Sequence, residues 1–417
     1  MIIMHIDANS AYLSWTAVDL LEKGYPIDVR TVPAVISGNP DNRRGIILTK
    51  SIPAKKYGIK TGESLFEARR KYPKLLVFPP NYDLYLLCSE AMVNILKEYN
   101  PRIQRYSVDE CFLDYTQSQK KFGSPIQAAH EIKDRIKDEL GFTVNIGVGE
   151  NKLLAKMASE FEKPNKVHTL FKEEIKSKMW PLPIGELFMV GRATANKLKK
   201  ININTIGDLA NSDLRHMKAM LKSHGELVWN YANGIDFSEV TRNIDIEQKG
   251  VGNSTTIAYD VTDRQGAREV MLALCERTAM RLRRLQKKAS LVSISIKTNT
   301  FVRYSHQIQL ANYIDAASDI YYYSCLLFDQ CWKGEYIRQL GVSVSNLGTG
   351  NEIQLSLFNE RSNEFDRNSK LEYTIDDIRK RFGEKSVIRG TFVNSEVEAL
   401  QGGVNDGNYL MMGGYQL

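Results

Sequence analysis

The sequence predicts an α+β fold divided into several domains, and three observations support that prediction. A chain of 417 residues is too long to share one hydrophobic core. Strand-like and helix-like segments alternate over the first 175 residues, and they return in the order βαββαβ between residues 251 and 347. The segment between these two regions, 176–240, reads as a small helical domain.

The composition is typical of a globular protein that stays out of membranes. Hydrophobic residues make up 43% of the chain and charged residues 25%. The net charge of +7 and the isoelectric point near 8.9 permit a polyanionic partner without requiring one. No apolar run approaches the length of a membrane span, and the apolar stretch at 1–6 is too short for a signal peptide.

The cysteines show neither a CxxC pattern nor the spacing of a zinc site. Their number is odd and their surroundings are apolar, which indicates free thiols in a reducing compartment. We therefore expect a cytoplasmic protein. The five are Cys88, Cys111, Cys275, Cys325 and Cys331.

The first half of the chain predicts one sheet with a small basic lobe beside it. An apolar strand at 1–7 leads into an amphipathic helix, and the basic segment at 50–74 is mostly helical. Its positive charge suits an anion, although a solvated helical face would explain it equally well. The predicted elements of this half are strand 1–7, helix 9–22, strand-like segments within 28–49, strand 75–78, helix 82–99, strands 101–106 and 111–115, helix 126–140, and strand 143–148.

Three carboxylates are expected to meet at one edge of that sheet. Asp109 and Glu110 lie between two predicted strands, at a hairpin tip where neighbouring side chains can turn toward one point. Asp7 ends the N-terminal strand, so it joins them if the strands are neighbours. Each feature alone has a plainer explanation, a polar turn or a helix N-cap. Together, oxygen-only ligands suit Mg²⁺, and two such ions can promote phosphoryl transfer.

The end of the first region places lysines beside the same sheet. Gly147 and Gly149 close the strand at 143–148, and a helix that begins near Lys152 carries Lys156. Helix N-termini and ammonium groups both favour phosphate. The Gly-x-Gly pattern alone is weak evidence for such a site.

The second half predicts a separate α+β unit followed by a tail. Val292, Ile294 and Ile296 alternate with polar residues, as expected of a sheet buried on one face. The stretch 277–303 holds many arginines and lysines and no acid, which suits a sugar-phosphate backbone or, alternatively, a solvated amphipathic helix. The predicted elements are strand 253–259, helix 264–288, strands 291–298 and 301–310, helix 314–332, strand 337–346, and a short helix 371–382.

These motifs together resemble those of the Y-family translesion DNA polymerases. The matching features are Asp7 with Tyr12 five positions on, the run Ser107-Val108-Asp109-Glu110, the lysine-bearing helix after residue 151, and Lys163-Pro164-Asn165. The chain looks closest to the UmuC-like branch, the catalytic subunit of DNA polymerase V and its relatives. The resemblance covers residues 1 to about 350.

The resemblance implies a right-hand polymerase in which a palm with a ferredoxin-like sheet is joined by small fingers, a helical helix-hairpin-helix thumb and a βαββαβ little finger. The implied domains are the palm at 1–22 and 75–175, the fingers at 23–74, the thumb at 176–240, a linker at 241–250, the little finger at 251–347, and a C-terminal tail at 348–417.

The same resemblance implies the active-site roles. Two Mg²⁺ ions would be held by Asp7, Asp109, Glu110 and the backbone carbonyl of Ala8. The incoming dNTP would be bound by Ser10, Tyr12, Thr49, Lys55 and Lys156, with Tyr12 as the steric gate against ribonucleotides. The chain departs from the family pattern where it has Ile52 and Lys55 in place of a Tyr and an Arg, and Ala8 in place of an aromatic residue. Lysine offers a point charge rather than a bidentate fork.

Primer-template DNA is the expected partner of the thumb and little finger. The stretch 187–200 resembles a helix-hairpin-helix, although Met189 stands where the family commonly has glycine. Backbone N–H groups in such a motif hold phosphate without reading sequence. The DNA-binding residues implied are Val190 and Gly191 in the hairpin, and Asn253, Ser254, Arg338 and Ser343 in the little finger.

The tail carries a run that resembles the peptide by which bacterial polymerases bind the sliding clamp. The expected clamp contacts are Gln354, Leu355, Leu357 and Phe358. The implied function is low-fidelity translesion synthesis in the SOS response to DNA damage, by a monomer at the replication fork. Accessory proteins are further expected partners in this branch. The alternatives are a palm-fold nucleotidyl cyclase and a catalytically weak, clamp-bound DNA-binding repair protein that needs accessory subunits.

Overall fold

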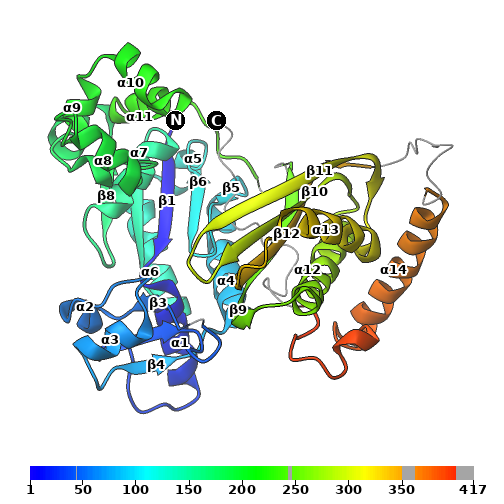
Figure 1. The fold of residues 1–417 in the computed structure, drawn as a ribbon. Helices are drawn as coiled ribbons and strands as arrows, with labels where there is room; N and C mark the ends of the chain where they lie inside the picture. Colours follow the sequence, from blue (N-terminus) through cyan, green and yellow to red (C-terminus); the bar gives the residue numbers. More distant parts are fainter. Residues whose placement is uncertain (44, 243–246, 350–361, 401–417) are drawn as a thin grey trace. The chain divides into compact units, whose positions relative to one another are not determined.

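A computed structural model describes residues 1–43, 45–242, 247–349 and 362–400, with side chains of the last segment from residue 367 (Figure 1). The described residues divide into two compact units. The first draws on 1–38 and 46–242, and the second on 39–43, 45, 247–349 and 362–400. Among the described residues, no helix is both long and apolar enough to cross a membrane.

The first unit is built on a five-stranded sheet in the order β5-β6-β1-β7-β8 (Figure 1). β1 lies at its centre, is buried along its whole length, and pairs antiparallel with β6 and β7. The strands are β1 (Ile3–Ala8), β5 (Ile103–Arg105), β6 (Glu110–Asp114), β7 (Val144–Gly149) and β8 (Val167–Leu170). The helices that accompany them are α1 (Ala11–Glu22), α4 (Tyr82–Tyr99), α5 (Gln119–Phe122), α6 (Pro125–Leu140) and α7 (Lys152–Glu160).

Helix α7 packs closely on β1 and β7 because two glycines remove the side chains between them. A Cβ on Gly147 would lie 2.0 Å from the carbonyl oxygen of Ala155, and one on Gly149 would lie 2.8 Å from the nitrogen of the same residue. Both distances are shorter than any real contact. The Gly-x-Gly pattern that the sequence placed beside a phosphate site therefore serves helix–sheet packing.

A second, three-stranded sheet in the order β3-β2-β4 also belongs to the first unit. Its elements are β2 (Ala34–Ser37), β3 (Ile47–Lys50), β4 (Leu76–Phe78), α2 (Ile52–Lys56) and α3 (Leu65–Lys71). The predicted strand at 75–78 was grouped with the large sheet, and that grouping is wrong. β4 pairs in parallel with β2, and Leu75 packs with Val35 and Ile47 in a core shared with α2 and α3.

The rest of the first unit is helical, as predicted for 176–240. Its core includes Met179, Leu198 and Tyr231, and it is continuous with buried residues of α7. The elements are a turn at Lys172–Glu174, a wide turn at Ile175–Met179, a turn at Ile184–Glu186, and helices α8 (Arg192–Lys199), α9 (Ile206–Ala210), α10 (Leu214–Leu221) and α11 (Ser223–Ala232).

The second unit contains a four-stranded antiparallel sheet in the order β11-β10-β12-β9, with α12 and α13 packed on one face. Val292, Ile294 and Ile296 are buried against the helices, which confirms the predicted one-sided burial. The elements are β9 (Gly250–Val261), α12 (Arg264–Arg284), β10 (Lys288–Thr298), β11 (Arg303–Ile314), α13 (Ala317–Cys331), β12 (Ile337–Gly348), α14 (Ser362–Phe382) and a short turn at Gly390–Phe392.

Candidate active site

The register of two strands brings the predicted carboxylates together. Asp7 on β1 stands opposite Glu110, the first residue of β6, and the backbone nitrogen of Ala8 donates a hydrogen bond to the carbonyl oxygen of Asp109 at 2.9 Å. Asp109 precedes the strand, and its carboxylate accepts a 2.5 Å hydrogen bond from the hydroxyl of Ser107. The sequence therefore located this edge correctly.

The three carboxylates differ in their ionisation. Burial raises the pKa of Asp7, against the charge of Lys163, and burial likewise raises the pKa of Asp109. Burial opposes ionisation of Glu110 too, but a hydrogen bond from His5 and the charge of Lys156 outweigh it and lower its pKa to about 2. Because their pKa values are raised, a bound cation would favour the ionised forms of Asp7 and Asp109.

Two lysines neutralise these carboxylates in the structure. Lys156 on α7 lies 2.9 Å from Glu110, and Lys163 forms an ion pair with Asp7. Glu160 bridges the two lysines, at 3.3 Å from Lys156 and 2.9 Å from Lys163. Within the described part of the chain, no three His, Cys, Asp or Glu side chains are gathered as a preassembled metal centre. The backbone brings the three carboxylate residues together, and the side chains of Asp7 and Glu110 face the ammonium groups of Lys163 and Lys156.

Lys163 and His5 are site residues that sequence reasoning missed. The sequence signal for Lys163 is the motif Lys163-Pro164-Asn165, which does not by itself indicate a contact with a carboxylate. His5 precedes Asp7 by two positions, so both face the same side of β1. The ring is fully buried, with Nδ1 2.8 Å from the hydroxyl of Ser159 and Nε2 3.4 Å from Glu110. Burial lowers the pKa of His5.

Tyr12 lies in the first turn of α1, where an aromatic cluster fixes its ring. The ring stacks on Tyr85 with centroids 4.4 Å apart and planes inclined by 5°, and it meets Tyr82 edge-on at 6.2 Å. Burial and the nearby charge of Asp109 raise the pKa of Tyr12 to about 12. Ser10 caps this helix at φ 49°, and its exposed side chain makes no capping hydrogen bond.

Thr49 and Lys55 flank a short basic turn in the lobe of the small sheet. Thr49 is half-buried on β3, and Lys55 is exposed in the last turn of α2. Lys50 stands between them in sequence, and burial together with the charge of Lys55 lowers the pKa of Lys50. Two like charges held this close favour a bound anion. Lys50 was not among the predicted site residues, although it belongs to the same basic run.

The hairpin before α8 adopts a tight turn, although Met189 stands where the family commonly has glycine. Met189 takes a left-handed backbone conformation, with φ 69°. For a residue with a side chain this conformation costs about 1–2 kcal/mol. Gly191 is the N-cap of α8, and Val190 is buried and donates its backbone N–H to Leu187. The turn is therefore closed despite the substitution.

The four predicted contacts in the second unit do not share one surface. Ser254 and Ser343 are exposed on the face of the sheet away from the helices. Asn253 pairs with Val342, which is buried toward the helices, so its side chain points to the covered face. Arg338 lies over the ring of Phe301, 5.0 Å from its centroid.

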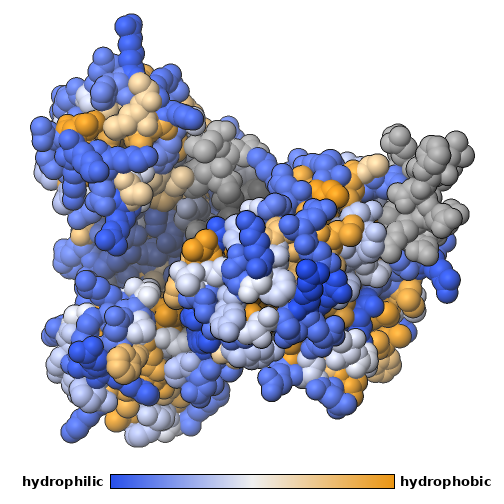
Figure 2. Space-filling model, in the orientation of Figure 1, coloured by the Kyte–Doolittle hydropathy of each residue, from blue (hydrophilic) through white to orange (hydrophobic). Residues whose placement is uncertain are grey.

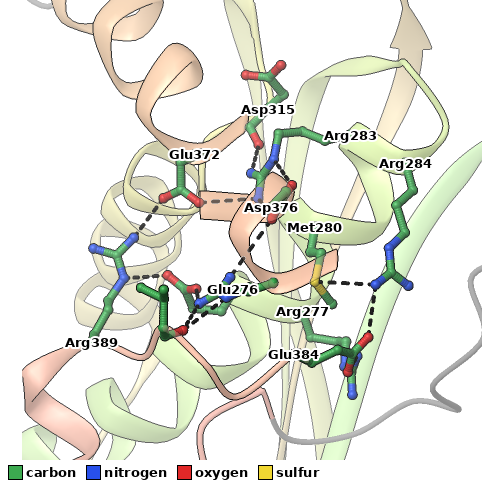
Figure 3. A network of polar contacts seen from close by, with 12 residues as sticks. Glu276, Arg277, Met280, Arg283, Arg284, Asp315, Glu372, Asp376, Glu384 and Arg389 are labelled. Carbon is green, nitrogen blue, oxygen red and sulfur yellow. Dashed lines mark hydrogen bonds and ion pairs between the residues drawn. The ribbon is translucent and has the colours of Figure 1, made fainter. Parts of the chain in front are cut away.

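The prediction that the basic run 277–303 contacts a sugar-phosphate backbone is wrong for Arg277 and Arg283 in its helical part. Arg277 and Arg283 are only 5% and 3% exposed. Arg283 pairs with Glu372 and Asp376, and Arg277 pairs with Glu384. Figure 3 shows these acids entering from the C-terminal segment. Asp376 lies 93 residues downstream of Arg283, and Glu384 lies 107 residues downstream of Arg277, so a local count of charges could not reveal these partners.

The predicted clamp contacts, Gln354, Leu355, Leu357 and Phe358, lie outside the described residues.

Comparison with known families finds two matches in this chain. Residues 6–160 match the impB/mucB/samB family, and residues 248–357 match the C-terminal domain of the same family. The first match contains Asp7, Asp109 and Glu110, and the second contains the four-stranded sheet of the second unit.

The curated relatives include proteins named DNA polymerase IV. The one from Clostridium acetobutylicum is 49% identical over 395 residues, which cover 95% of this chain and 99% of that protein. The protein named DNA polymerase IV 2 of Bacillus subtilis is 34% identical over 408 residues, 96% of each chain.

Solved structures with the same fold include Y-family polymerases. A Y-family DNA polymerase chimera of Dbh and Dpo4 aligns with a TM-score of 0.71 at 20% identity, over 83% of this chain and 99% of that one. DinB from Sulfolobus solfataricus aligns with a TM-score of 0.54 at 21% identity, with the same coverage. At this level of identity the comparison establishes the fold.

Proposed function

Because this chain belongs to the impB/mucB/samB family of Y-family DNA polymerases, it is a DNA-directed DNA polymerase, and we propose that it copies damaged templates by two-metal nucleotidyl transfer. One observation carries the catalytic part of the proposal. The register of β1 and β6 opposes Asp7 to Glu110, and the hydrogen bond from Ala8 fixes Asp109 beside them. The primer 3′-hydroxyl would attack the α-phosphate of a dNTP at this edge, and pyrophosphate would leave.

The residues present fit two Mg²⁺ ions. The donors are oxygen-only: Asp7, Asp109, Glu110 and the carbonyl of Ala8. Burial disfavours the charge of Asp7 and Asp109, and ammonium groups already neutralise two of the carboxylates, so this edge favours cations. When bound, Mg²⁺ supplies charge stabilisation for phosphoryl transfer.

The lysines are proposed to hold the triphosphate. Lys156 and Lys163 would exchange their carboxylate partners for phosphate oxygens once the metal ions neutralise Asp7 and Glu110. In the lobe of the small sheet, Lys50 and Lys55 repel one another and would be relieved by an anion, with Thr49 beside them. Ser10 would add a hydroxyl contact at the helix start.

Tyr12 is proposed to select the sugar. Its ring is held by Tyr85 and lies near Asp109, so it has little freedom to move aside for a 2′-hydroxyl. A ring against C2′ excludes ribonucleotides by contact.

Primer-template DNA is proposed to be bound by both units. We assign the palm to the five-stranded sheet, the fingers to the small sheet, the thumb to helices α8–α11 and the little finger to the second sheet. Gly191 would offer its backbone N–H to a phosphate, and Ser254 and Ser343 would face the DNA backbone. The predicted contact at Val190 is left out, because its N–H already donates to Leu187 and the residue is buried. Asn253 and Arg338 are the less supported contacts, given where the structure places them.

The branch within the family is better supported as DNA polymerase IV than as UmuC. Relatives at 49% and 34% identity over nearly the whole chain carry the name DNA polymerase IV. That name favours a DNA polymerase over the alternative of a catalytically weak repair protein that needs accessory subunits. We retain docking to the sliding clamp through 354–358 as part of the proposal.

Primer extension on undamaged and abasic templates tests the proposal. Asp109→Ala should abolish extension in the presence of Mg²⁺ and leave primer-template binding nearly intact. Asp114→Ala is the matched control, because Asp114 lies at the far end of β6, the strand that Asp109 precedes, opposite Ile3. Substantial extension by Asp109→Ala would remove this residue from the catalytic site, and joint loss of binding and folding would assign it a structural role.

A further inference from the structure

Two buried asparagine side chains lie beside the carboxylate edge of the five-stranded sheet. Figure 2 shows hydrophilic residues over most of the visible surface, where water can satisfy their polar groups. Asn145 on β7 is instead fully buried, and Asn9, which follows β1, is 9% exposed. The Nδ2 of Asn9 donates a hydrogen bond to the Oδ1 of Asn145 at 3.1 Å. Because a buried amide is costly unless it is hydrogen-bonded, the other partners of this pair indicate its role.

The side chain of Asn145 uses its full hydrogen-bonding capacity. Its Nδ2 donates to the carbonyl oxygens of Ser159 at 3.1 Å and Glu162 at 2.6 Å. Its Oδ1 accepts from the backbone nitrogen of Lys166 at 3.3 Å, as well as from Asn9. Two donors and two acceptor positions are all that this side chain offers. Its three backbone partners lie in one segment, 159–166, which runs from the last turn of α7 to the start of β8.

Asn9 holds the same segment from the end of β1. Its Oδ1 accepts hydrogen bonds from the backbone nitrogen of Asn165 at 2.9 Å and from the hydroxyl of Thr143 at 3.0 Å. Its own backbone nitrogen donates to the carbonyl oxygen of Thr143 at 2.9 Å. The two asparagines therefore anchor the backbone both before and after Lys163.

The anchored segment brings Lys163 to the carboxylate edge. Asn145 stands opposite Asp7 in the register of β7 and β1, so both side chains lie on the same face of the sheet. Lys163 forms an ion pair with Asp7 and a second one with Glu160 at 2.9 Å. Lysine has a flexible stem, so the position of its ammonium group depends on how firmly its backbone is held.

We propose that Asn145, together with Asn9, is a positioning residue that holds Lys163 where its ammonium group reaches the triphosphate of the incoming nucleotide. This rests on the role proposed above for Lys163. Asn145 acts through the backbone of 159–166 and not through a contact with the nucleotide. A charged group that is held in place before the substrate arrives loses less freedom on binding, so the asparagine pair strengthens the binding of dNTP.

A double-mutant cycle tests this, with the apparent Kd for dNTP and the maximal rate measured by pre-steady-state incorporation. Asn145→Ala should raise the apparent Kd roughly tenfold and change the maximal rate much less, because a charge-assisted contact with phosphate is weakened. Lys163→Met should raise it at least as much. In the Lys163→Met background, Asn145→Ala should add little, since the side chain through which it acts is already absent.

Hydrogen exchange supplies a readout besides activity. The backbone amide of Lys166 should lose protection in Asn145→Ala, and that of Asn165 should lose protection in Asn9→Ala. Asn9→Ala takes the place of Asn145→Ala in the cycle if the latter does not fold, which thermal unfolding decides. Asn151→Ala is the matched control, because Asn151 also hydrogen-bonds backbone groups but at the opposite end of α7. It should lower Tm and leave the apparent Kd unchanged.

The outcomes separate this inference from the proposal on which it rests. If Lys163→Met leaves the apparent Kd unchanged, the triphosphate role of Lys163 fails and the inference falls with it. If Lys163→Met raises the apparent Kd while the folded asparagine variants bind dNTP like wild type, only the inference is overturned. If the fold-changes of Asn145→Ala and Lys163→Met multiply in the double variant, Asn145 acts independently of Lys163 and the inference is wrong.

Discussion

Asp7 and Glu110 are directly opposed in the register of β1 and β6, yet each carboxylate is neutralised by a different lysine. Lys163 reaches Asp7 from the loop after α7, and Lys156 reaches Glu110 from within the helix. Asp109, beside them, has a raised pKa and a single hydroxyl partner in the side-chain contacts described above. Of the three carboxylates, Asp109 is therefore the one that has no ion pair with a lysine among these contacts.

Asp109→Asn should stabilise the metal-free protein. Burial raises the folded pKa of Asp109 above the unfolded value, so its ionisation costs stability as pH rises through that range. Removal of the charge should raise Tm in EDTA at neutral pH, by about 2–4 °C per kcal/mol relieved. Mg²⁺ should then stabilise wild type more than the variant. A lower Tm for Asp109→Asn in EDTA would contradict this.

Glu110 should behave in the opposite way with pH. Its folded pKa of about 2 lies below the unfolded value, so its contribution to stability is present above the unfolded pKa and is lost as pH falls toward 2. Glu110→Gln should therefore reduce stability at neutral pH and make unfolding less sensitive to acid. Denaturant unfolding of both proteins at several pH values measures this, and equal slopes against pH would refute it.

Tyr12→Ala should increase ribonucleotide incorporation relative to deoxynucleotide incorporation, by roughly 10- to 100-fold if a contact of 1–3 kcal/mol is lost. Tyr12→Phe keeps the ring and its stacking on Tyr85, so its sugar preference should match wild type. Single-turnover incorporation of rNTP and dNTP measures the ratio. Unchanged sugar preference in a Tyr12→Ala protein with reduced Tm would assign Tyr12 to the core alone.

Arg283→Met should destabilise the second unit without changing the salt dependence of DNA binding. Loss of Arg283 leaves Glu372 with Arg389 and Asp376 with Arg379 at 3.9 Å, and removal of one partner from a buried ion-pair network costs up to about 3–5 kcal/mol. Arg264→Met is the control, because its pair with Asp329 is exposed. The slope of log K against log salt counts phosphate contacts. A smaller slope for folded Arg283→Met would restore this residue to the DNA interface.

Gly147→Ala should severely impair folding. The added methyl group would overlap the carbonyl oxygen of Ala155, so α7 must shift away from the sheet and carry Lys156 with it. Gly185→Ala is the control, because its Cβ would lie 3.8 Å from the nearest side chain. Soluble yield and Tm distinguish the two variants, and normal stability of Gly147→Ala would show that α7 tolerates the shift.

Local sequence patterns predicted most elements and the edge of the sheet that carries the site. The strand ending at Asp7 and the hairpin at Asp109 and Glu110 are short-range signals, and their meeting follows from strand pairing. The features that could not be predicted depend on contacts between segments that lie far apart in the sequence. The parallel pairing of β4 with β2 depends on shared core contacts, and β8, a four-residue strand with one buried residue, has almost no periodic signal.

Side-chain partners were the least predictable part of the site. Lys156 was expected to face phosphate, and the structure pairs it with Glu110. Arg283 sat in a run without acids, yet its partners come from a distant helix. Ion pairs depend on which segments of the chain meet in the fold. A count of charged residues in one stretch therefore overestimates how many of them are available to bind a ligand.

The downstream position of the acids that neutralise α12 sets an order for biosynthesis. Glu276, Arg277 and Arg283 are synthesised before their partners in 372–389, so the second unit emerges from the ribosome with these charges unmatched. A chain stopped at residue 357, where the family match ends, would keep them so. Pairing of these charges therefore waits for the synthesis of residues 372–389, and that segment completes the ion-pair network of α12.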